Sequence, residues 1–595
     1  MHNSRKSAVN VQSFIMVLQN NPNHIQQING AERFAPHCAS QHVKWTEAGI
    51  EFAFSTRFPS QGGSNVGDEI TLLLGDDHDY RSSDRCECMA HGMSIFIDKK
   101  SGCCRILTSI VGLPPLFMYK DEQRIVLSSD LFLLTTIHDM ALEFDPHSVL
   151  DLCKVGHTTN HKTLFKDVVM IPGGQSVSWS RGGTASLKKA WEPQPGRDSL
   201  DWEDLSEEQI DAFLHAVQEM DVNRCFLALT SGLDTRAILS ALVHLQRDLP
   251  DSYTISGYPL SLDAIGAREL CRHYDIKHHI IILNELFHAG LEKYTTEACR
   301  LSGGVASLSQ AHEVFFYDQI DREYIGRISG NLGNQVGRLG TEGISMRNAS
   351  PDVIEPDLIA SLADYDHACH WFDQMRNRQG GLGSIALLQD EVPNSSCGNY
   401  CIGNYYAVQK TPYADRKLIE LAAQMPGDES HQRASLIGMR IKDLQHRFLG
   451  EPENKSFQRR LIKSCGGFAS EYPINCGWKA QGGISARGTV LGLLSMIDAL
   501  YHMKHITNHF AQQMLTYTGV FGLYEYRHTF LWIKNYLKEY IHDVVLDCAC
   551  TSPLRKKAVS DVFHDYFYNG ATCQYNTICF ALDIALANTI FLRHG

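Results

Sequence analysis

At 595 residues the chain is too long for one compact core, so two or more domains are expected. Apolar residues make up 44% of the sequence and charged residues 20%, which is typical of globular proteins and excludes general disorder. The formal net charge of -13 excludes the basic surface of a nucleic-acid-binding protein, and no long run of Lys and Arg indicates a membrane-surface patch.

The sequence indicates a cytoplasmic protein without a membrane partner. Arg5 and Lys6 are not followed by the uninterrupted apolar segment of a signal peptide. The most apolar late stretch, 578–592, contains Asp583 and Asn588 and is too short to span a bilayer. The 18 cysteines are scattered and form no paired zinc-binding pattern, so we expect reduced thiols.

Residues 1–190 predict a layered β domain. Two short apolar runs, 95–97 and 104–107, flank a polar turn and predict a hairpin. Two further runs, 116–119 and 125–127, flank a second polar turn. Short strands at this spacing are typical of stacked sheets.

The composition changes at 191–208, which is rich in Pro and acidic residues and is the expected linker. Ser206 is the expected N-cap of a helix that runs to Met220. The second domain, 209–595, begins with strands at 225–229, 253–256 and 277–283, separated by helices at 237–245 and 264–274. This βαβαβ order predicts an α/β fold with a parallel, doubly wound sheet, followed by a mostly helical region beyond residue 350.

The segment from Thr230 to Arg236 carries the strongest chemical signal. It joins a buried strand to a helix, where backbone N–H groups can surround an anion. Its hydroxyl groups add short donors, and Gly232 permits a close approach of the backbone. Asp234 cannot face a phosphate directly, so a bridging Mg²⁺ is the expected partner. An ordinary capped helix start has the same composition and stays open as an alternative.

This segment resembles the pyrophosphate loop of the asparagine synthetase family, Ser-Gly-Gly-x-Asp-Ser. Thr230 stands for the first Ser, Ser231 and Gly232 for the two Gly, Asp234 matches, and Thr235 replaces the last Ser. The Walker type of phosphate loop is disfavoured because no Gly-Lys-Ser/Thr ending is present.

Other segments resemble the same family in the same order. Ser329-Gly330-Asn331-Leu332-Gly333-Asn334-Gln335 lies where the family has Ser-Gly-Glu-Gly-x-Asp-Glu. Weaker matches, together covering roughly residues 90–430, are 113–119 with 127–130, 156–157, 164–165, 171–174, 256–257 with Asp263, Ala267, His278 and His279, and 411–415.

The resemblance implies an N-terminal glutaminase-like domain of the N-terminal-nucleophile (Ntn) type and a PP-loop ATP-pyrophosphatase domain. It implies ATP and Mg²⁺ as cofactors, and a reaction in which a carboxylate is adenylated and an amine then attacks. The implied ATP- and pyrophosphate-binding residues are Ala228, Thr230, Ser231, Gly232, Leu233, Asp234, Thr235, Ser256, Ser329 and Gly330. Asp234 is also the implied metal ligand, with Glu342 as a candidate helper.

Lys479 and Arg236 are the implied catalytic residues. Lys455 and Lys463 compete with Lys479 for the role of the late lysine that family members place near the pyrophosphate. For Arg236, an exposed position on the helix surface is the alternative.

The sequence departs from the family in two places. Position 2 is His2 and the first cysteine is Cys38, so the thiolate that glutamine hydrolysis needs is missing and the N-terminal domain is expected to be inactive. Asn331, Asn334 and Gln335 replace three acidic residues, and amides are poorer Mg²⁺ ligands than carboxylates.

The leading hypothesis is therefore an ATP-dependent amide ligase that acts on small-molecule or peptide carboxylates and amines, as the β-lactam and lasso-peptide synthetase relatives do. Two alternatives stay open: a non-catalytic nucleotide-binding protein of the same fold, and asparagine synthesis from glutamine or ammonia. The helical tail after residue 488 is a candidate region for substrate recognition or homodimer formation.

Overall fold

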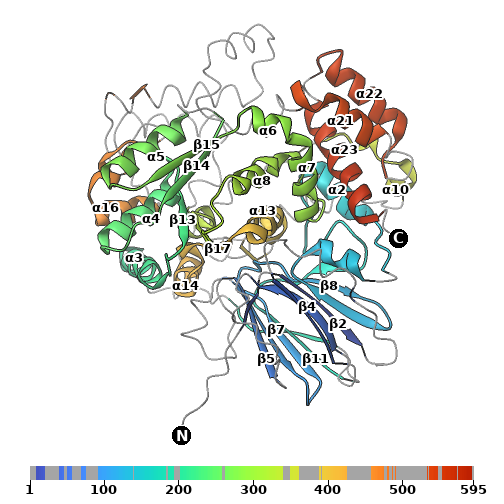
Figure 1. The fold of residues 1–595 in the computed structure, drawn as a ribbon, viewed down its shortest axis with the longest axis horizontal. Helices are drawn as coiled ribbons and strands as arrows, with labels where there is room; N and C mark the ends of the chain where they lie inside the picture. Colours follow the sequence, from blue (N-terminus) through green and yellow to red (C-terminus); the bar gives the residue numbers. More distant parts are fainter. Residues whose placement is uncertain are drawn as a thin grey trace.

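The structure is a computed structural model of the chain (Figure 1). It describes parts of 9–75, 92–192 except 138–139 and 182–184, 202–338 except 258–260, 347–360 except 348, 388–389, 392–424, 457–480 except 475–478, 486, 489–490, 533–546 except 534, and 553–592 except 572–573. His2, Cys38, Glu342 and Lys455, which entered the sequence-based predictions, lie outside the described residues.

The N-terminal domain contains two six-stranded sheets. The strands of the first, in spatial order, are β1 (Val9–Val11), β5 (Glu69–Gly75), β6 (Gly92–Asp98), β7 (Cys103–Leu107), β11 (Gln175–Ser180) and β12 (Ser186–Lys189). Those of the second are β10 (Val168–Met170), β8 (Phe117–Lys120), β9 (Arg124–Ser128), β2 (Ser13–Gln19), β4 (Ile50–Thr56) and β3 (Ala39–Trp45). The layered β domain expected for this part of the chain is thus present.

The two sheets face each other because alternate residues of their strands are apolar. Phe14, Met16 and Leu18 of β2 lie in the apolar layer between the sheets. Ile15 and Val17 point the other way, into a second core shared with the helices of the rest of the chain. Strand β2 is therefore buried on both faces.

The hairpin that the sequence predicted is confirmed, and the two further apolar runs form a second hairpin. Strands β6 and β7 pair antiparallel around Asp98, whose carboxylate accepts a hydrogen bond from the backbone N–H of Lys100 at 2.9 Å. Strands β8 and β9 pair around Asp121, which accepts from the backbone N–H groups of Gln123 and Arg124 at 2.8 Å each. In each case a short acidic side chain closes the turn.

The start of the next helix differs from the prediction. Helix α3 spans Trp202–Glu219, so Ser206 lies inside it rather than at its N-cap. The Ser206 hydroxyl is buried and accepts a hydrogen bond from the guanidinium of Arg460. A contact with a residue far along the chain, which local sequence cannot reveal, therefore accounts for this serine.

The second domain is built on five parallel strands in the order β15-β14-β13-β16-β17. Their bounds are β13 (Cys225–Ala228), β14 (Ser252–Ser256), β15 (His278–Ile282), β16 (Gly326–Ile328) and β17 (Val408–Lys410). The helices that follow β13 and β14 are α4 (Leu233–His244) and α5 (Leu262–His273). The predicted βαβαβ alternation is confirmed.

Helices cover both faces of this sheet, as expected of a doubly wound fold (Figure 1). On one face Leu227 packs in a core with residues of α4 and α5. On the other face the ring of Phe226 contacts Tyr253, at 5.3 Å between centroids, and Phe316 of helix α8 (Ala311–Asp318), at 5.9 Å. Successive residues of β13 thus pack into cores on opposite faces of the sheet.

The remaining elements are mostly helical, and most of them lie beyond residue 350, as predicted. They are η5 (Leu131–Thr136), α2 (Pro146–Lys154), α6 (Glu285–Ala289), α7 (Leu291–Leu301), η6 (Leu308–Gln310), α9 (Gly333–Arg338), η7 (Pro351–Val353), α10 (Pro356–Ala360), α13 (Val392–Tyr406), η9 (Pro412–Ala414), α14 (Arg416–Gln424), α16 (Phe457–Cys465), α17 (Phe468–Glu471), α21 (Lys538–Ile541), η11 (His542–Leu546), α22 (Lys556–Phe567), α23 (Tyr575–Ala587) and η13 (Asn588–Leu592).

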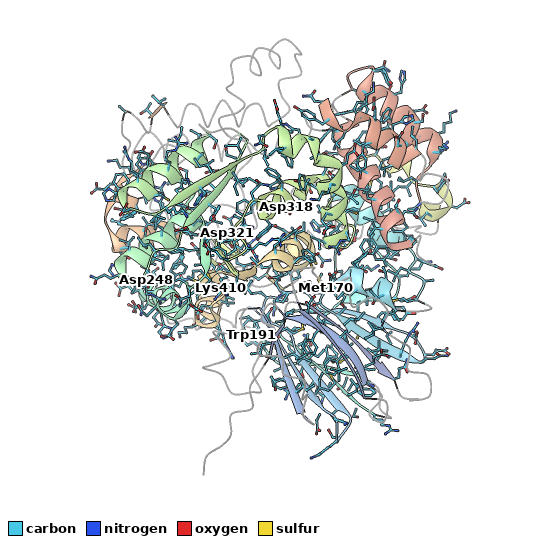
Figure 2. The ribbon with its side chains drawn as sticks, in the orientation of Figure 1. Met170, Trp191, Asp248, Asp318, Asp321 and Lys410 are labelled. Carbon is cyan, nitrogen blue, oxygen red and sulfur yellow. The ribbon has the colours of Figure 1, made fainter. Side chains whose placement is uncertain are left out.

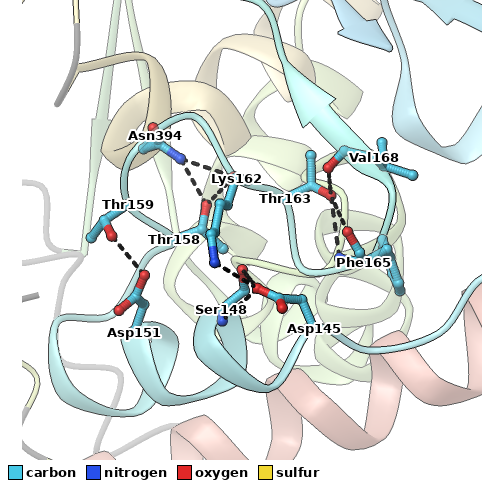
Figure 3. Close-up of polar contacts among 10 residues, drawn as sticks. All are labelled: Asp145, Ser148, Asp151, Thr158, Thr159, Lys162, Thr163, Phe165, Val168 and Asn394. Carbon is cyan, nitrogen blue, oxygen red and sulfur yellow. Dashed lines mark hydrogen bonds and ion pairs between the residues drawn. The ribbon is translucent and has the colours of Figure 1, made fainter. Parts of the chain in front are cut away.

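Polar contacts join the two domains. Asn394 at the start of α13 donates hydrogen bonds to the Thr158 hydroxyl at 2.8 Å and to the Lys162 carbonyl at 3.1 Å (Figure 3). The indole N–H of Trp191 donates to Glu420 of α14 at 3.3 Å, and Figure 2 places Trp191 where the β domain meets the parallel-sheet domain. The end of the β domain is therefore anchored on the second domain.

The last helical stretch, Tyr575–Leu592, is long and apolar enough to cross a membrane, with a mean hydropathy of 1.4. From the sequence, the segment 578–592 was predicted to be too short to span a bilayer. That prediction of length was wrong, because the helical stretch begins at Tyr575. Within the protein this stretch is 72% buried, as in a core helix. The ring of Phe591 lies 5.1 Å from that of Phe165, between centroids, and so packs against the β domain.

A buried ion pair fixes this stretch in place. Asp583 is 2% exposed and its carboxylate lies 2.7 Å from the Arg347 guanidinium. The hydroxyl of Ser307 donates a second hydrogen bond to the same carboxylate. We expect Asp583→Ala to lower the free energy of unfolding by about 3–5 kcal/mol, because it leaves Arg347 buried without its partner. Urea denaturation measures this loss.

The double variant Arg347→Met with Asp583→Leu is the control, and it should cost less than the single change. If Asp583→Ala lowers the free energy of unfolding by less than about 1 kcal/mol, the ion pair with Arg347 is not a buried, stabilising contact.

His278 on strand β15 should make stability depend on pH. Burial lowers the pKa of His278 from 6.5 to about 4, and its Nε2 is buried without a hydrogen-bond partner. The imidazole is neutral in the folded protein but takes up a proton when the chain unfolds, so the stability it contributes above pH 6.5 is lost as the pH falls toward 4.

Between pH 7 and 4.5 we expect the wild-type protein to lose about 1–2 kcal/mol more stability than His278→Phe, measured by urea denaturation at each pH. His215→Phe, at an exposed position of α3, should behave as wild type. Parallel pH profiles for His278→Phe and wild type would show that the side chain is solvated.

Candidate functional site

The candidate site lies where the strand order reverses. The chain leaves β13 through α4 and reaches β14 on one side, and it later enters β16 on the other side of β13. The carboxyl ends of β13 and β16 are therefore neighbours, because the two strands pair in parallel. In open parallel sheets this is where ligands bind. The predicted residue Ser329 directly follows β16, and Thr230 lies two residues after the end of β13.

The turn between β13 and α4 is held by its own hydroxyl groups. The backbone N–H of Thr230 donates to the Thr235 hydroxyl at 3.2 Å, and that of Gly232 donates to the Thr230 hydroxyl at 3.1 Å. Gly232 is the N-cap of α4 and supplies no side-chain hydrogen bond to it. The positive end of a 12-residue helix, beginning at Leu233, therefore faces the strand edge.

Ser231 points toward α5. Its N–H donates to the carboxylate of Asp263 at 3.1 Å. Its hydroxyl packs on Gly266, where an added Cβ would lie 2.4 Å from Ser231 Oγ. This close contact brings the start of α5 against the turn. The side chain of Ser231 is thus a packing contact here, and its N–H has a carboxylate partner.

Asp234 faces the segment that follows β16. An added Cβ at Gly330 would lie 2.6 Å from Asp234 Cβ, and one at Gly333 would lie 2.8 Å from Asp234 Cγ. Only glycine permits this approach. The hydroxyl of Tyr413 donates to the Asp234 carbonyl at 3.0 Å. The structure thus brings the first turn of α4 against Gly330.

The other predicted binding residues lie at the same edge. Ala228 is the last residue of β13, and Ser256 is the last of the neighbouring strand β14. Ser256 is buried and its hydroxyl lies 2.6 Å from that of Ser261, the N-cap of α5. Ser329 is buried after β16, and its N–H donates to the carbonyl of Lys410 at 3.0 Å.

The geometry does not support a phosphate-binding role for Arg236, and it also excludes the exposed alternative. The residue is 0% exposed. Its guanidinium donates to four backbone carbonyls, those of Ser231 at 3.1 Å, Ala469 at 3.3 Å, Tyr472 at 2.5 Å and Pro473 at 3.2 Å. Burial lowers the pKa of Arg236 to about 10. The side chain points into the core, where it joins the carbonyl of Ser231 in the turn to the carbonyls in and directly after α17.

Lys479 lies in the segment that Arg236 fastens. It forms an isolated β-bridge with Pro473, whose carbonyl accepts from Arg236. The Nε–H of Arg459 donates to the carbonyl of the next residue, Ala480, at 3.3 Å. Two arginines therefore fix the backbone around Lys479. The competing Lys463 is exposed in the last turn of α16.

The residues present could hold Mg²⁺ only with help from a ligand. The described part of the chain contains no group of three His, Cys, Asp or Glu side chains placed to bind a metal ion. Asp234 supplies one carboxylate, while Asn334 is exposed and the Asn331 carbonyl accepts from Thr411 at 2.9 Å. One carboxylate with phosphate oxygens and water is a set that Mg²⁺ accepts.

Sequence reasoning missed one residue that touches Asp234. Gln458 lies at the start of α16, and its Nε2 donates to Asp234 Oδ1 at 2.8 Å. The two residues are 224 positions apart. A single glutamine in an amphipathic helix carries no signal of such a contact.

Arg236 provides a test of this architecture. We expect Arg236→Leu to lower the free energy of unfolding by about 3 kcal/mol, because several buried carbonyls lose their donor. Arg236→Lys should recover only part of the loss, since one ammonium cannot reach four carbonyls arranged around a planar fork. Guanidinium denaturation measures both changes.

Arg272→Leu on the exposed face of α5, where the side chain is 76% exposed, is the control and should change stability by about 0.5 kcal/mol or less. A fully stable Arg236→Leu would show that the carbonyls find other donors.

The chain was compared with known proteins. No family model matches it, and no curated protein matches it. A solved structure with a partial likeness is an NH3-dependent NAD synthetase from Campylobacter jejuni subsp. jejuni NCTC 11168, in complex with the nitrate ion. The two are 14% identical over 30% of this chain and 82% of that chain, with a TM-score of 0.18. A likeness this low indicates nothing about the site, whose features are the turn that begins at Thr230 and the strand-order reversal of the sheet.

Proposed function

We propose that this chain is an ATP-dependent amide-forming ligase of the PP-loop type. A carboxylate oxygen of one substrate forms a bond to the α-phosphorus of ATP, and pyrophosphate leaves with the electrons of the broken P–O bond. The nitrogen of an amine then attacks the acyl carbon of the adenylate, AMP leaves, and the nitrogen loses a proton. The product is an amide.

One observation carries this proposal. The first turn of α4 and the segment after β16 meet at the strand-order reversal, in contact through Asp234 and two glycines, Gly330 and Gly333. This arrangement places a helix N-terminus, hydroxyl groups and one carboxylate at a single edge of the sheet. Those groups suit the diphosphate of a nucleotide and its metal ion.

Each residue of the turn has a role in the proposed mechanism. The N–H groups at the start of α4, from Leu233 onward, bind the leaving pyrophosphate and stabilise the negative charge that develops on it. The hydroxyls of Thr230 and Thr235 hold the turn in shape. Asp234 orients the metal ion, which supplies positive charge to the phosphate oxygens when it is bound. Lys479 is the proposed cation near the reacting centre.

We also propose that the N-terminal domain is a glutaminase-like domain of the Ntn type. Its two facing sheets are compatible with that fold.

A second candidate function is nucleotide binding without catalysis. The N–H groups of Thr230, Ser231 and Gly232 already have partners within the protein, and amides stand at Asn331 and Asn334 in place of carboxylates. Such a site could bind ATP for regulation or for partner binding. Isotope exchange between pyrophosphate and ATP separates the two candidates, because only adenylation is reversible in this way.

We expect exchange with a panel of amino-acid and peptide carboxylates, and we expect Asp234→Asn to reduce it by about 100-fold without unfolding the protein. Asp248→Asn, at an exposed position in the loop that follows α4 (Figure 2), is the control and should exchange as wild type. Wild-type exchange in Asp234→Asn would remove Asp234 from the mechanism. ATP binding without exchange for any carboxylate would favour the second candidate.

A further inference from the structure

Gln458 connects three segments at the candidate site. It is the second residue of α16 and is 0% exposed. Its Nε2 donates to Asp234 Oδ1 at 2.8 Å and to the carbonyl of Gly333 at 2.7 Å. Asp234 belongs to the first turn of α4, and Gly333 to the segment after β16. One side chain therefore bonds to both sides of the strand-order reversal.

The two contacts fix the chemistry of this side chain. A primary amide carries two N–H donors, and here each has an acceptor. Both acceptors are oxygens, so the amide nitrogen must face them. A carboxylate at this position would instead repel Asp234. Glutamine thus binds one oxygen of Asp234 without bringing a second charge to the site.

The packing of the residue before Gln458 holds the start of α16 in place. The ring of Phe457, the preceding residue, lies 5.4 Å from that of Phe213, between centroids, and 6.3 Å from that of Tyr413. Tyr413 in turn donates to the carbonyl of Asp234 at 3.0 Å. The main chain and the side chain of Asp234 are therefore each held by a buried neighbour.

We propose that Gln458 is a positioning residue, which holds the Asp234 carboxylate in the orientation that binds the divalent cation of the nucleotide complex. The inference rests on the proposed function, because it assigns Asp234 to that cation. By donating to Oδ1, Gln458 fixes the plane of the carboxylate that would bind the metal ion. It also keeps α4 and the Gly333 segment at a fixed separation, so α16 becomes part of the site.

The experiment is a calorimetric titration of the full chain with ATP at increasing Mg²⁺ concentrations. For Gln458→Leu we expect the Mg²⁺ concentration at half-maximal ATP binding to rise by about 10- to 100-fold, as for other groups that orient metal ligands. Gln409→Leu is the matched control. Gln409 is also a buried glutamine, and its Nε2 also donates twice, to the Tyr317 hydroxyl at 3.1 Å and the Ala407 carbonyl at 2.8 Å.

The Gln409→Leu variant should lose stability but keep the wild-type Mg²⁺ midpoint. Suppose that the wild-type protein binds ATP with Mg²⁺ but that Gln458→Leu has the same Mg²⁺ midpoint. That result overturns this inference and leaves the proposed function standing. Failure of the wild-type protein to bind ATP overturns both.

A second variant, Gln458→Glu, keeps the size of the side chain and places a second carboxylate beside Asp234. We expect its melting temperature to fall in the absence of divalent cations, because the two carboxylates repel each other. Added Mg²⁺ should raise the melting temperature of Gln458→Glu more than that of wild type, since the pair then forms a two-carboxylate site. An equal Mg²⁺-induced shift in both proteins would overturn the positioning role even if Gln458→Leu fails to fold.

Discussion

The close contact between the first turn of α4 and the segment after β16 is the constraint on which the candidate site depends. Cβ atoms at Gly330 and Gly333 would lie within 3 Å of Asp234, so larger residues would force the two segments apart. The two hydrogen bonds of Gln458, to Asp234 and to Gly333, depend on this short distance between the two segments. The helix N-terminus, the Asp234 carboxylate and the buried Ser329 face one edge of the sheet because the two backbones meet there.

Much of the fold could be predicted from the sequence, because it follows from local patterns. The hairpin around Asp98 and the alternation of strands and helices after Cys225 were both confirmed. Turn residues and hydrophobic period report directly on such elements. A turn between a buried strand and a helix was confirmed for the same reason, although α4 begins at Leu233 rather than at residue 237.

What the sequence missed depends on contacts between distant residues. Ser206 has the composition of an N-cap but accepts a hydrogen bond from Arg460 inside a helix. Arg236 has the composition of an exposed helix residue or a phosphate ligand, yet its partners include carbonyls more than 230 positions away. Hydrophobic period and turn chemistry report on neighbours along the chain and carry no information on such distant pairs.

The core beneath the β domain has a consequence for the order of folding. It contains Ile15 of β2 and Phe591 of the last helical stretch, and the ring of Phe591 lies against Phe165. Part of this core therefore stays uncovered during synthesis until residues near 590 have left the ribosome. A core shared by segments so distant in the sequence is completed late, and until then it exposes apolar surface that chaperones bind.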